Sequence, residues 1–314
     1  MRDNQTTESE VARRITAVVV THNSGELIEA CLDSLERNLE SEPGLRVVLV
    51  DNGSSDDTAE LGRQHRLRPT VIEQENLGYA AGVNAGIASI GDSDCQVLIL
   101  NPDVTLDARA VSELADAVED EDVGISVPRL VDGDRRLLHS LRREPTALRS
   151  LGSGVLGPFA RRFAFLSEEV TSDTAYNEPT FADWATGAAM LISSDCRRVV
   201  GRWDESYFLY SEETDYALRA RELGFRLRLA PSASAVHLGG ESATSPRLWS
   251  LLTINRVRLQ RRRRGFFRAI PFALAIAVSE CLRAALGRAY APRLEEAGRG
   301  HTSRRTSRLR SGRI

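Results

Sequence analysis

The chain has 314 residues, enough to bury a sizeable core, and its hydrophobic and charged fractions of 42% and 27% are ordinary for a soluble protein. Its four cysteines are far apart and form no Cys-x-x-Cys pair, which argues against a disulfide framework or a zinc site and favours reduced thiols in a cytoplasmic protein. The net charge of -3 is uneven, because residues 251–314 hold 16 arginines against 3 acids, and such basic tails commonly meet anionic membranes or nucleic acid.

From the N-terminus, short apolar runs alternate with stretches of helical spacing. Residues 1–13 are polar and charged, which predicts a disordered leader and not a signal peptide. Beyond them, β-branched or apolar runs predict buried strands, at residues 15–20, 46–50, 70–73, 96–100 and 124–127. Connecting helices are predicted after Ser24, from Asp56 or Asp57, over 78–90 and over 106–118. This alternation predicts an α/β fold with a mostly parallel sheet and helices on both faces.

The next part of the chain is less regular. Residues 132–182 show no clear pattern. Order is predicted to return with a strand at 188–192, a helix at 211–223 and short strands at 226–229 and 233–237.

The C-terminal part combines helical spacing with positive charge. Residues 249–264 are predicted to be helical and end in four arginines. The apolar stretch 270–278 is too short to span a bilayer, which takes about 20 residues, and with its basic neighbours it favours an interfacial amphipathic segment. Residues 291–314 are expected to be disordered.

Three of the predicted strands stop abruptly at polar, turn-forming residues. The segments are Val18 to Ser24, Val48 to Asp56 and Leu98 to Asp103, and an acidic helix start, Tyr210 to Tyr216, comes far downstream. Ligands of open α/β sheets bind beyond the carboxyl ends of the strands. We therefore expect these strand ends and the acidic helix start to converge on one site.

Each of these residues also has a purely structural explanation. Asp103 could hold Mg²⁺ or Mn²⁺, which prefer oxygen ligands, but a solvated aspartate in an Asn-Pro turn would give the same sequence. Asp51 could bind a base or ribose, or only stabilise its turn. Acids at a helix start are favoured by the helix dipole, and a lone histidine such as His237 is more often structural, although the glycines after it permit close approach of a ligand.

Taken in order, these segments resemble glycosyltransferase family 2, the inverting enzymes of the GT-A fold, and within it the bacterial rhamnosyltransferase-like branch. The resemblance covers roughly residues 14–245 and rests on seven motifs in the family's order, none of them specific alone. Besides the first two strand ends, the motifs are Glu75 to Gly86, Leu100 to Asp103, Trp184 to Ala189, Val200 to Asp215 and His237 to Ser242.

The resemblance implies a division of the chain. A GT-A domain would span 14–245, with a nucleotide-binding half at about 14–130 and an acceptor half at about 131–245. Beyond the resemblance, helical spacing and the excess of arginine predict a helical, membrane-associating segment at 246–290 and a disordered basic tail at 291–314. The protein would then be cytoplasmic and peripheral on the inner face of the plasma membrane, and a homo-oligomer is compatible with the sequence.

The resemblance also implies residue roles. The nucleotide pocket would be lined or bordered by Thr21, Asn23, Asp51, Asn76, Gly78, Asn84 and Asn101. Asp103 would hold Mg²⁺ or Mn²⁺ on the diphosphate, and His237 would complete that metal site. The donor sugar and the acceptor would lie against Trp184, Gly187 and Glu212. The general base would be Glu213, which aligns with the family's aspartate, with Asp215 as a nearby alternative.

The implied reaction is a single displacement with inversion. An acceptor hydroxyl attacks the anomeric carbon, the base takes its proton, and the metal stabilises the departing diphosphate. The best single donor is dTDP-L-rhamnose, and the acceptor is a glycan or a lipid-linked glycan of the cell envelope. Two residues depart from the family pattern, because Asn101 stands where the metal turn has its first aspartate and Glu213 replaces the aspartate of a Glu-Asp pair.

Other classes of protein fit less well. The two departures allow a catalytically inactive GT-A module that binds sugar or acts as a scaffold. A nucleotidyltransferase would need a basic residue in the loop after the first strand, and a Rossmann domain would need Gly-x-Gly-x-x-Gly there, and neither is present. Nucleic-acid binding through the tail is disfavoured by the acidic body and by the lack of aromatics among the tail arginines.

Overall fold

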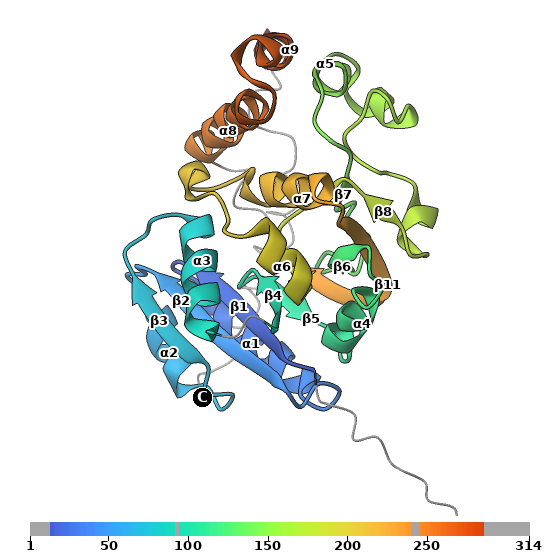
Figure 1. Ribbon diagram of the computed structural model, residues 1–314. Coiled ribbons are helices and arrows are strands. Elements are labelled where there is room, and N and C mark those ends of the chain that lie inside the picture. Colours follow the sequence, from blue (N-terminus) through green and yellow to red (C-terminus); the bar gives the residue numbers. More distant parts are fainter. Residues whose placement is uncertain (1–12, 92–93, 240–244, 286–314) are drawn as a thin grey trace, which may run out of the picture. The chain divides into compact units, whose positions relative to one another are not determined.

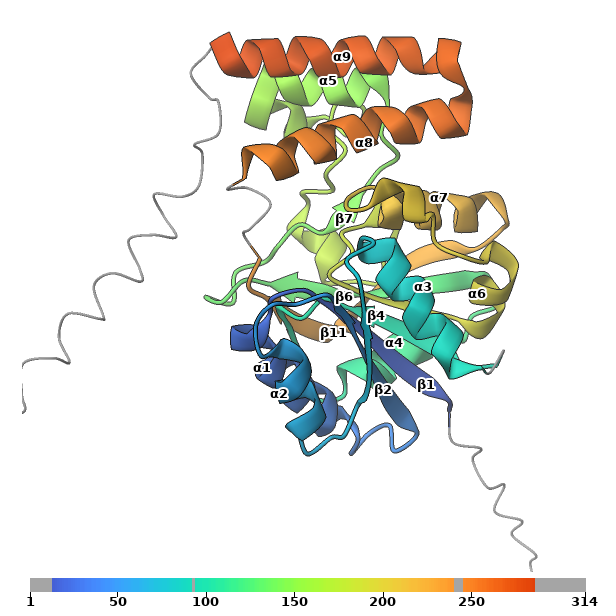
Figure 2. The same cartoon turned by 90° about the vertical axis from the view of Figure 1, so that its left-hand side faces the viewer.

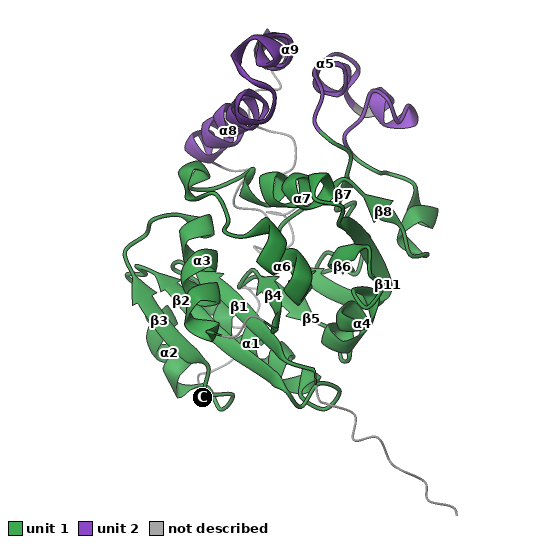
Figure 3. Cartoon of the chain, viewed as in Figure 1, with its two compact units in different colours: residues 1–144, 169–238 green, residues 145–168, 239–314 purple. Residues whose placement is uncertain are grey.

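The structure is a computed structural model that describes residues 13–91, 94–239 and 245–285. It divides into two compact units, unit 1 with residues 1–144 and 169–238 and unit 2 with residues 145–168 and 239–314 (Figure 3). The predictions for residues 1–12, for Gly240 to Ser242 and for the tail 291–314 fall outside the described residues.

Unit 1 is built on a nine-stranded sheet whose first half is parallel. β1 (Ile15–Thr21), β2 (Leu45–Asn52), β3 (Thr70–Gln74) and β4 (Gln96–Leu100) lie in the order β3-β2-β1-β4 (Figure 1). All seven residues of β1 are buried, as expected for a parallel strand covered on both faces. The strands predicted here are confirmed, with β2 slightly longer than expected.

Helices cover both faces of this parallel half. α1 (Gly25–Asn38) and α2 (Thr58–Gln64) lie on one side of the strands and α3 (Tyr79–Ile90) on the other (Figure 2). α3 is rich in glycine and alanine because its backbone approaches β1 closely: a Cβ added at Gly86 would lie 2.4 Å from a methyl of Val18. The small side chains therefore place the start of α3 over the ends of β1 and β2.

The second half of the sheet is mixed. β10 (Ala189–Ile192) runs antiparallel between β4 and β6 (Val123–Val131), β11 (Arg226–His237) runs parallel to β6, and β5 (Val104–Leu106) closes the edge antiparallel to β11. The prediction of two strands at 226–229 and 233–237 is corrected to one strand, which changes register between Ala230 and Ser234 as at a β-bulge.

The remaining elements of unit 1 surround this sheet. They are α4 (Ala110–Ala117), α6 (Ser194–Val200), α7 (Glu212–Glu222), the 3-10 turns η2 (Asp173–Tyr176) and η3 (Glu205–Tyr207), β8 (Phe181–Ala182), which pairs with β11, and the pair β7 (Leu141–Arg142) with β9 (Trp184–Ala185). The helix predicted from 106 begins only at Ala110, because residues 104–106 are taken by β5.

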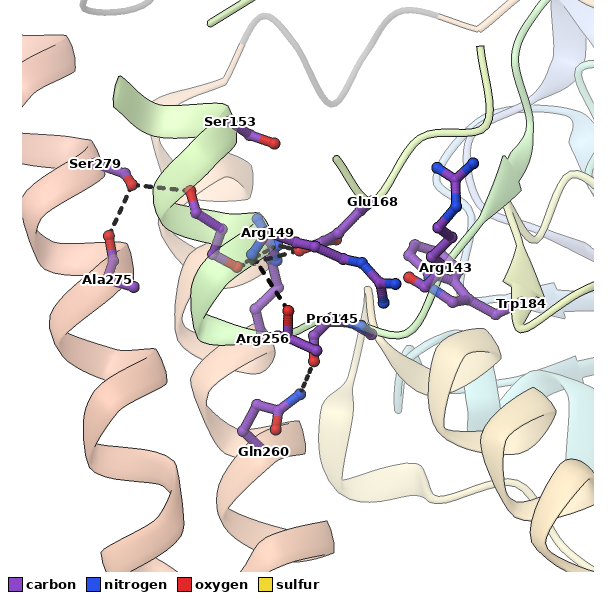
Figure 4. Close-up of polar contacts among 12 residues, drawn as sticks. Arg143, Pro145, Arg149, Ser153, Glu168, Trp184, Arg256, Gln260, Ala275 and Ser279 are labelled. Carbon is purple, nitrogen blue, oxygen red and sulfur yellow. Dashed lines mark hydrogen bonds and ion pairs between the residues drawn. The ribbon is translucent and has the colours of Figure 1, made fainter. Parts of the chain in front are cut away.

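Unit 2 joins an internal segment to the C-terminal helices. It contains α5 (Ala147–Leu156), the 3-10 turn η1 (Gly157–Arg162), α8 (Pro246–Arg264) and α9 (Phe266–Ala285). The Ser279 hydroxyl donates to the Ser150 carbonyl at 3.1 Å, and the Gln260 amide donates to the Pro145 carbonyl at 2.7 Å (Figure 4). The prediction of irregular chain over 132–182 therefore missed α5. Within the described ranges, no helix is long and apolar enough to cross a membrane.

Candidate functional site

The ends of β1 and β2 form one side of the site. Thr21 pairs with Asp51 in the parallel register, so both polar side chains leave the sheet together. Asp51 is buried and accepts hydrogen bonds from the Ser54 amide, at 3.0 Å, and from the Ser54 hydroxyl. The Thr21 hydroxyl is buried with no hydrogen-bond partner in the described parts of the chain, so a polar ligand atom could satisfy it.

Asn23 ties the two strand ends together. Its backbone is left-handed, with φ of 51°, and its side-chain oxygen accepts from the Ser55 amide at 2.7 Å. The backbone amide of Asn23 donates to the Ser54 hydroxyl at 2.8 Å. The loop after β2 is thus fixed against the loop after β1, and the geometry around Asp51 is set before any ligand binds.

The start of α3 borders this loop. Gly78 has φ of 99°, and a Cβ there would lie 2.4 Å from the Phe208 carbonyl oxygen, so glycine is required by both conformation and space. Asn76 accepts a hydrogen bond from the Gly78 amide at 3.2 Å. Asn52, which sequence reasoning missed as a site residue, is buried and donates to the Gly78 carbonyl at 3.1 Å. Its position directly after Asp51 in the second motif was the available signal.

The Asn84 side chain is held by hydrogen bonds to the segment before α7. Its amide nitrogen donates to the Trp203 carbonyl at 2.9 Å and to the Glu205 carboxylate at 2.8 Å, and its oxygen accepts from the Trp203 amide at 3.0 Å. These bonds join α3 to the segment that precedes α7. The predicted contact of Asn84 with nucleotide stays a prediction, and its present partners are all protein groups.

The Asn-Pro-Asp turn follows β4 and meets the end of β11. Antiparallel pairing sets His237 opposite Val104, and the Leu238 amide donates to the Asp103 carbonyl at 3.1 Å. The His237 Nε2 atom consequently lies 3.2 Å from a carboxylate oxygen of Asp103, with both side chains about three-quarters buried. Adjacent ligands in an octahedral shell with bonds of about 2.1 Å lie about 3 Å apart, so this pair fits a shared divalent cation.

Asn101 holds the turn in place. Its amide donates to the Ala188 carbonyl at 2.9 Å, and its side-chain oxygen accepts from the Tyr79 hydroxyl at 2.8 Å. Because the Asn101 side-chain oxygen accepts from Tyr79, Asn101 fixes the turn against α3, and the predicted roles of Asp103 and His237 in metal binding stay predictions.

Two adjacent glutamates open α7. Glu212 is buried, and one of its carboxylate oxygens has no hydrogen-bond partner among the described residues. Burial first, and then the charge of Glu213, raise the pKa of Glu212 to about 8. Burial likewise raises the pKa of Glu213 to about 7, although this side chain is partly exposed. Since the two acids share a desolvated environment, ionising one opposes ionising the other.

Glu213 faces the stretch that was predicted to contact donor sugar and acceptor. A Cβ added at Gly187 would lie 3.3 Å from the Glu213 Cβ, so glycine leaves the glutamate room. Trp184 is anchored nearby through its indole nitrogen, which donates to the Arg143 carbonyl at 3.0 Å. Asp215 points elsewhere: it accepts from the Arg219 guanidinium at 2.7 Å in a largely buried ion pair.

The backbone just before α7 is strained. Phe208, Tyr210 and Ser211 all have positive φ, between 63° and 75°, although none is glycine. Such conformations cost free energy and cluster at functional sites. The Phe208 carbonyl accepts from the Tyr79 amide at 2.7 Å, so the strained segment is also tied to the start of α3.

Tyr79 shows that the separate parts meet. Burial first, and then the charges of Glu212, Glu213 and Asp103, raise the pKa of the Tyr79 phenol well above its usual value. The Tyr79 hydroxyl donates to Asn101 in the Asn-Pro-Asp turn, and its backbone amide donates to the Phe208 carbonyl before α7, so this residue joins the turn to the acidic helix start. The structure thus brings together the sequence segments that were expected to converge, while the role of each residue stays a prediction.

A second group of potential metal ligands lies elsewhere. Asp33 and Glu36 on α1 and His65 after α2 are close enough to share a cation. Arg66, however, pairs with both carboxylates, so the group already has a compensating charge. It is separate from the strand ends that form the candidate site.

Comparisons with known proteins identify the family. The model of glycosyl transferase family 2 matches residues 16–171. An N-acetylglucosaminyl-diphospho-decaprenol L-rhamnosyltransferase of Mycobacterium tuberculosis is 31% identical over 243 residues, which cover 71% of this chain and 75% of that protein. The rhamnosyltransferase WbbL of Escherichia coli is 27% identical over 228 residues, covering 70% of this chain and 81% of that protein.

Solved structures confirm the predicted GT-A fold. GalNAc-T7, crystallised with UDP, GalNAc and Mn²⁺, matches with a TM-score of 0.57 at 15% identity, covering 80% of this chain and 48% of that chain. The mannosyltransferase PcManGT from Pyrobaculum calidifontis, in complex with GDP-Man and Mn²⁺, matches with a TM-score of 0.55 at 19% identity, covering 90% and 77%. The family model and the 31% identical relative show that the chain belongs to glycosyl transferase family 2 and is a glycosyltransferase.

Proposed function

We propose that the protein transfers L-rhamnose, with inversion, from dTDP-L-rhamnose to a lipid-linked glycan during synthesis of a cell-envelope polysaccharide. The observation that carries the chemistry is the convergence of Glu213, Asp103 and His237 around the start of α3. The transferred rhamnose is supported by the names of two relatives, and the lipid-linked acceptor by one of them, an N-acetylglucosaminyl-diphospho-decaprenol L-rhamnosyltransferase.

Glu213 is the proposed general base. It takes the proton of the acceptor hydroxyl as that oxygen forms a bond to the anomeric carbon, while the bond from this carbon to the diphosphate oxygen breaks. A base with a pKa of about 7 is half ionised near neutral pH, and it can accept the hydroxyl proton as bond formation to the anomeric carbon makes that proton acidic. While Glu213 is ionised, Glu212 would keep its own proton, because burial and then the neighbouring charge of Glu213 both raise the pKa of Glu212. Asp215, which is paired with Arg219, is the weaker alternative.

Asp103 and His237 are the proposed holders of Mg²⁺ or Mn²⁺. A divalent cation supplies a Lewis acid that stabilises the negative charge of the departing diphosphate. The 3.2 Å separation of the two ligand atoms supports this assignment. Thr21 and Asp51 would bind the nucleoside, since the Thr21 hydroxyl is buried without a partner in the described structure and Asp51 is already oriented by Ser54.

The glycosyltransferase domain is proposed to span residues 14–245, with 145–168 folding beside the C-terminal helices. A lipid-linked acceptor would place the protein at the inner face of the plasma membrane, as a peripheral protein. The excess of arginine in residues 251–314 supports this location, because anionic lipids attract such segments.

The decisive experiment measures product from dTDP-L-rhamnose and a synthetic diphospholipid-linked N-acetylglucosamine, with Mg²⁺ or Mn²⁺. UDP- and GDP-linked sugars serve as competing donors, and the Glu213→Gln variant is the matched control. We expect turnover with the dTDP donor only, loss of turnover in the variant, and an inverted anomeric centre by NMR. A retained configuration would exclude the mechanism, and absence of turnover with every donor would favour the inactive sugar-binding module.

A further inference from the structure

The outward face of α9 is apolar along its length. Phe267, Ile270, Leu274 and Val278 recur at three- or four-residue spacing and are 81%, 41%, 61% and 45% exposed. We call these four residues the α9 stripe. Between 269 and 279, every exposed residue of this helix is apolar, which is unusual for a helix face that meets water.

The other faces of α9 are occupied within unit 2. Toward α5, the Ser279 hydroxyl donates to the Ser150 carbonyl, and a Cβ added at Gly154 would collide with Ser279 at 1.9 Å. Toward α8, Glu280 accepts from the Trp249 indole at 3.0 Å, and the Arg256 guanidinium lies 5.8 Å from the Phe272 ring centre. Because close packing fixes these faces, α9 cannot rotate to bury its stripe.

Positive charge adjoins the stripe. From Pro246 to Ser279 the chain holds eight arginines and no acid. Arg261 and Arg268 are exposed, and the Arg261 guanidinium lies 5.6 Å from the ring centre of Phe266, at the first turn of α9. A helix that combines an apolar face with flanking arginines is the pattern of segments that lie flat in the interface of an anionic membrane.

The segment packed against α9 has the same character. On α5, Leu148, Leu151 and Val155 form a second exposed apolar stripe, and Phe159 beyond it is 69% exposed. This segment interrupts unit 1 in the sequence but folds with the C-terminal helices. A fold that gathers exposed apolar side chains from two distant segments into one unit leaves much apolar surface for a partner to cover.

We propose that unit 2 docks the enzyme on an anionic lipid surface, with α9 lying in the interface plane, the α9 stripe inserted among the acyl chains, and the adjacent arginines on the lipid phosphates. None of the described helices is long and apolar enough to span a bilayer. The proposal builds on the proposed function only in identifying the membrane as the place where the acceptor resides.

The test is flotation of the full-length protein with phosphatidylglycerol vesicles and, separately, with phosphatidylcholine vesicles. The double variant Leu274→Glu/Val278→Glu and the single variant Phe267→Gln remove the stripe, and Arg261→Gln/Arg268→Gln reduces the charge. Val199→Glu, on α6 of unit 1 and 51% exposed, is the matched control. We expect wild type and the control to bind phosphatidylglycerol vesicles equally well. The double variant should bind them at least about tenfold more weakly, and the arginine variant should lose the preference for anionic lipid.

The outcomes separate this proposal from the proposed function. Unchanged binding in both stripe variants would overturn the proposal. A second outcome would also overturn it: light scattering shows that the wild type is a dimer, the double variant is a monomer, and the wild type does not bind vesicles. The α9 stripe would then join two copies of this chain. Turnover on a water-soluble acceptor should be the same in wild type and the double variant, whereas its absence in both would count against the proposed function and leave the vesicle result intact.

Discussion

The two sides of the site differ in whether their buried polar groups have hydrogen-bond partners. In the loops after β1 and β2, Asp51 and Asn23 are satisfied by the backbone and hydroxyl groups of Ser54 and Ser55. At the start of α7, Glu212 is buried with a carboxylate oxygen that has no partner in the described structure, and the backbone before it is strained. Apart from the buried Thr21 hydroxyl, which has no partner in the described structure, the first region is organised at little cost, whereas the second holds unfavourable free energy in the native state.

This contrast matches what each side would have to do. A nucleotide-binding loop gains affinity when its groups are oriented before binding, since less conformational entropy is lost. A general base, by comparison, must resist ionisation enough to accept a proton near neutral pH, and burial of Glu213 beside Glu212 achieves this. Changing single residues on each side should therefore give different kinds of effect.

The largest expected effect is that of Glu213→Gln. We expect kcat to fall about 10²- to 10⁴-fold, because the acceptor hydroxyl loses its base, while nucleotide affinity stays the same. In the wild type, kcat/KM should decline as the pH falls below about 7, where the raised pKa of Glu213 leaves the carboxyl protonated. Steady-state kinetics across pH 5 to 9, with nucleotide binding measured by calorimetry, checks both statements.

Asp215→Asn is the matched control for that variant. It removes the charge that Arg219 pairs with, so it should lower the melting temperature without removing the base. If instead Asp215→Asn lost the activity at full stability and Glu213→Gln kept it, the assignment of the base would be reversed.

The next largest effect concerns the metal pair. His237→Ala should weaken Mn²⁺ binding about 10- to 100-fold, because one ligand is lost, and Asp103→Asn should weaken it further, because the remaining oxygen carries no charge. Mn²⁺ titration in the presence of dTDP measures both. His65→Ala, in the separate group with Asp33 and Glu36, should leave this affinity unchanged, and an equal loss there would move the metal to α1.

Much of the fold could be predicted because its signals are local. The continuous apolar run of β1 and the glycine-rich spacing of α3 each follow from neighbouring residues. β5 could not be predicted, since its three residues become a strand only by pairing with β11, about 130 positions later. The same holds for α5, whose packing against Ser279 gives the segment 145–168 its place.

For the candidate site, residue types were more predictable than partners. The acids and the histidine follow from motif spacing, but two of the predicted residues bond to protein in ways that no spacing reveals. Asn84 is engaged by Trp203 and Asn101 by Tyr79, each through folding, whereas the Asp215–Arg219 pair has the i,i+4 spacing of a helix. The unpartnered oxygen of Glu212 is likewise a property of burial, which depends on the whole fold.

The smallest expected effect is a gain in stability, which measures the free-energy cost of the buried Glu212 at the start of α7. The folded-state pKa of Glu212, about 8, lies above the ordinary value of 4.5, so the native state favours the neutral acid. Between these two values the native state binds more protons than the unfolded state, and the free energy of unfolding contributed by Glu212 therefore decreases as the pH rises. Glu212→Gln is neutral at every pH, so its melting temperature should match that of wild type near pH 5. At pH 8 it should exceed wild type by roughly 3 to 6 °C, as expected for about 1 to 2 kcal/mol. Calorimetric scans at both pH values measure the difference, and a gain that is independent of pH would mean that the pKa of Glu212 is the same in the folded and unfolded states. Because Gln mimics the protonated acid, the acidic limb of kcat/KM should stay near pH 7 in this variant. That result would distinguish Glu212, which destabilises the fold when ionised, from Glu213, which takes the proton.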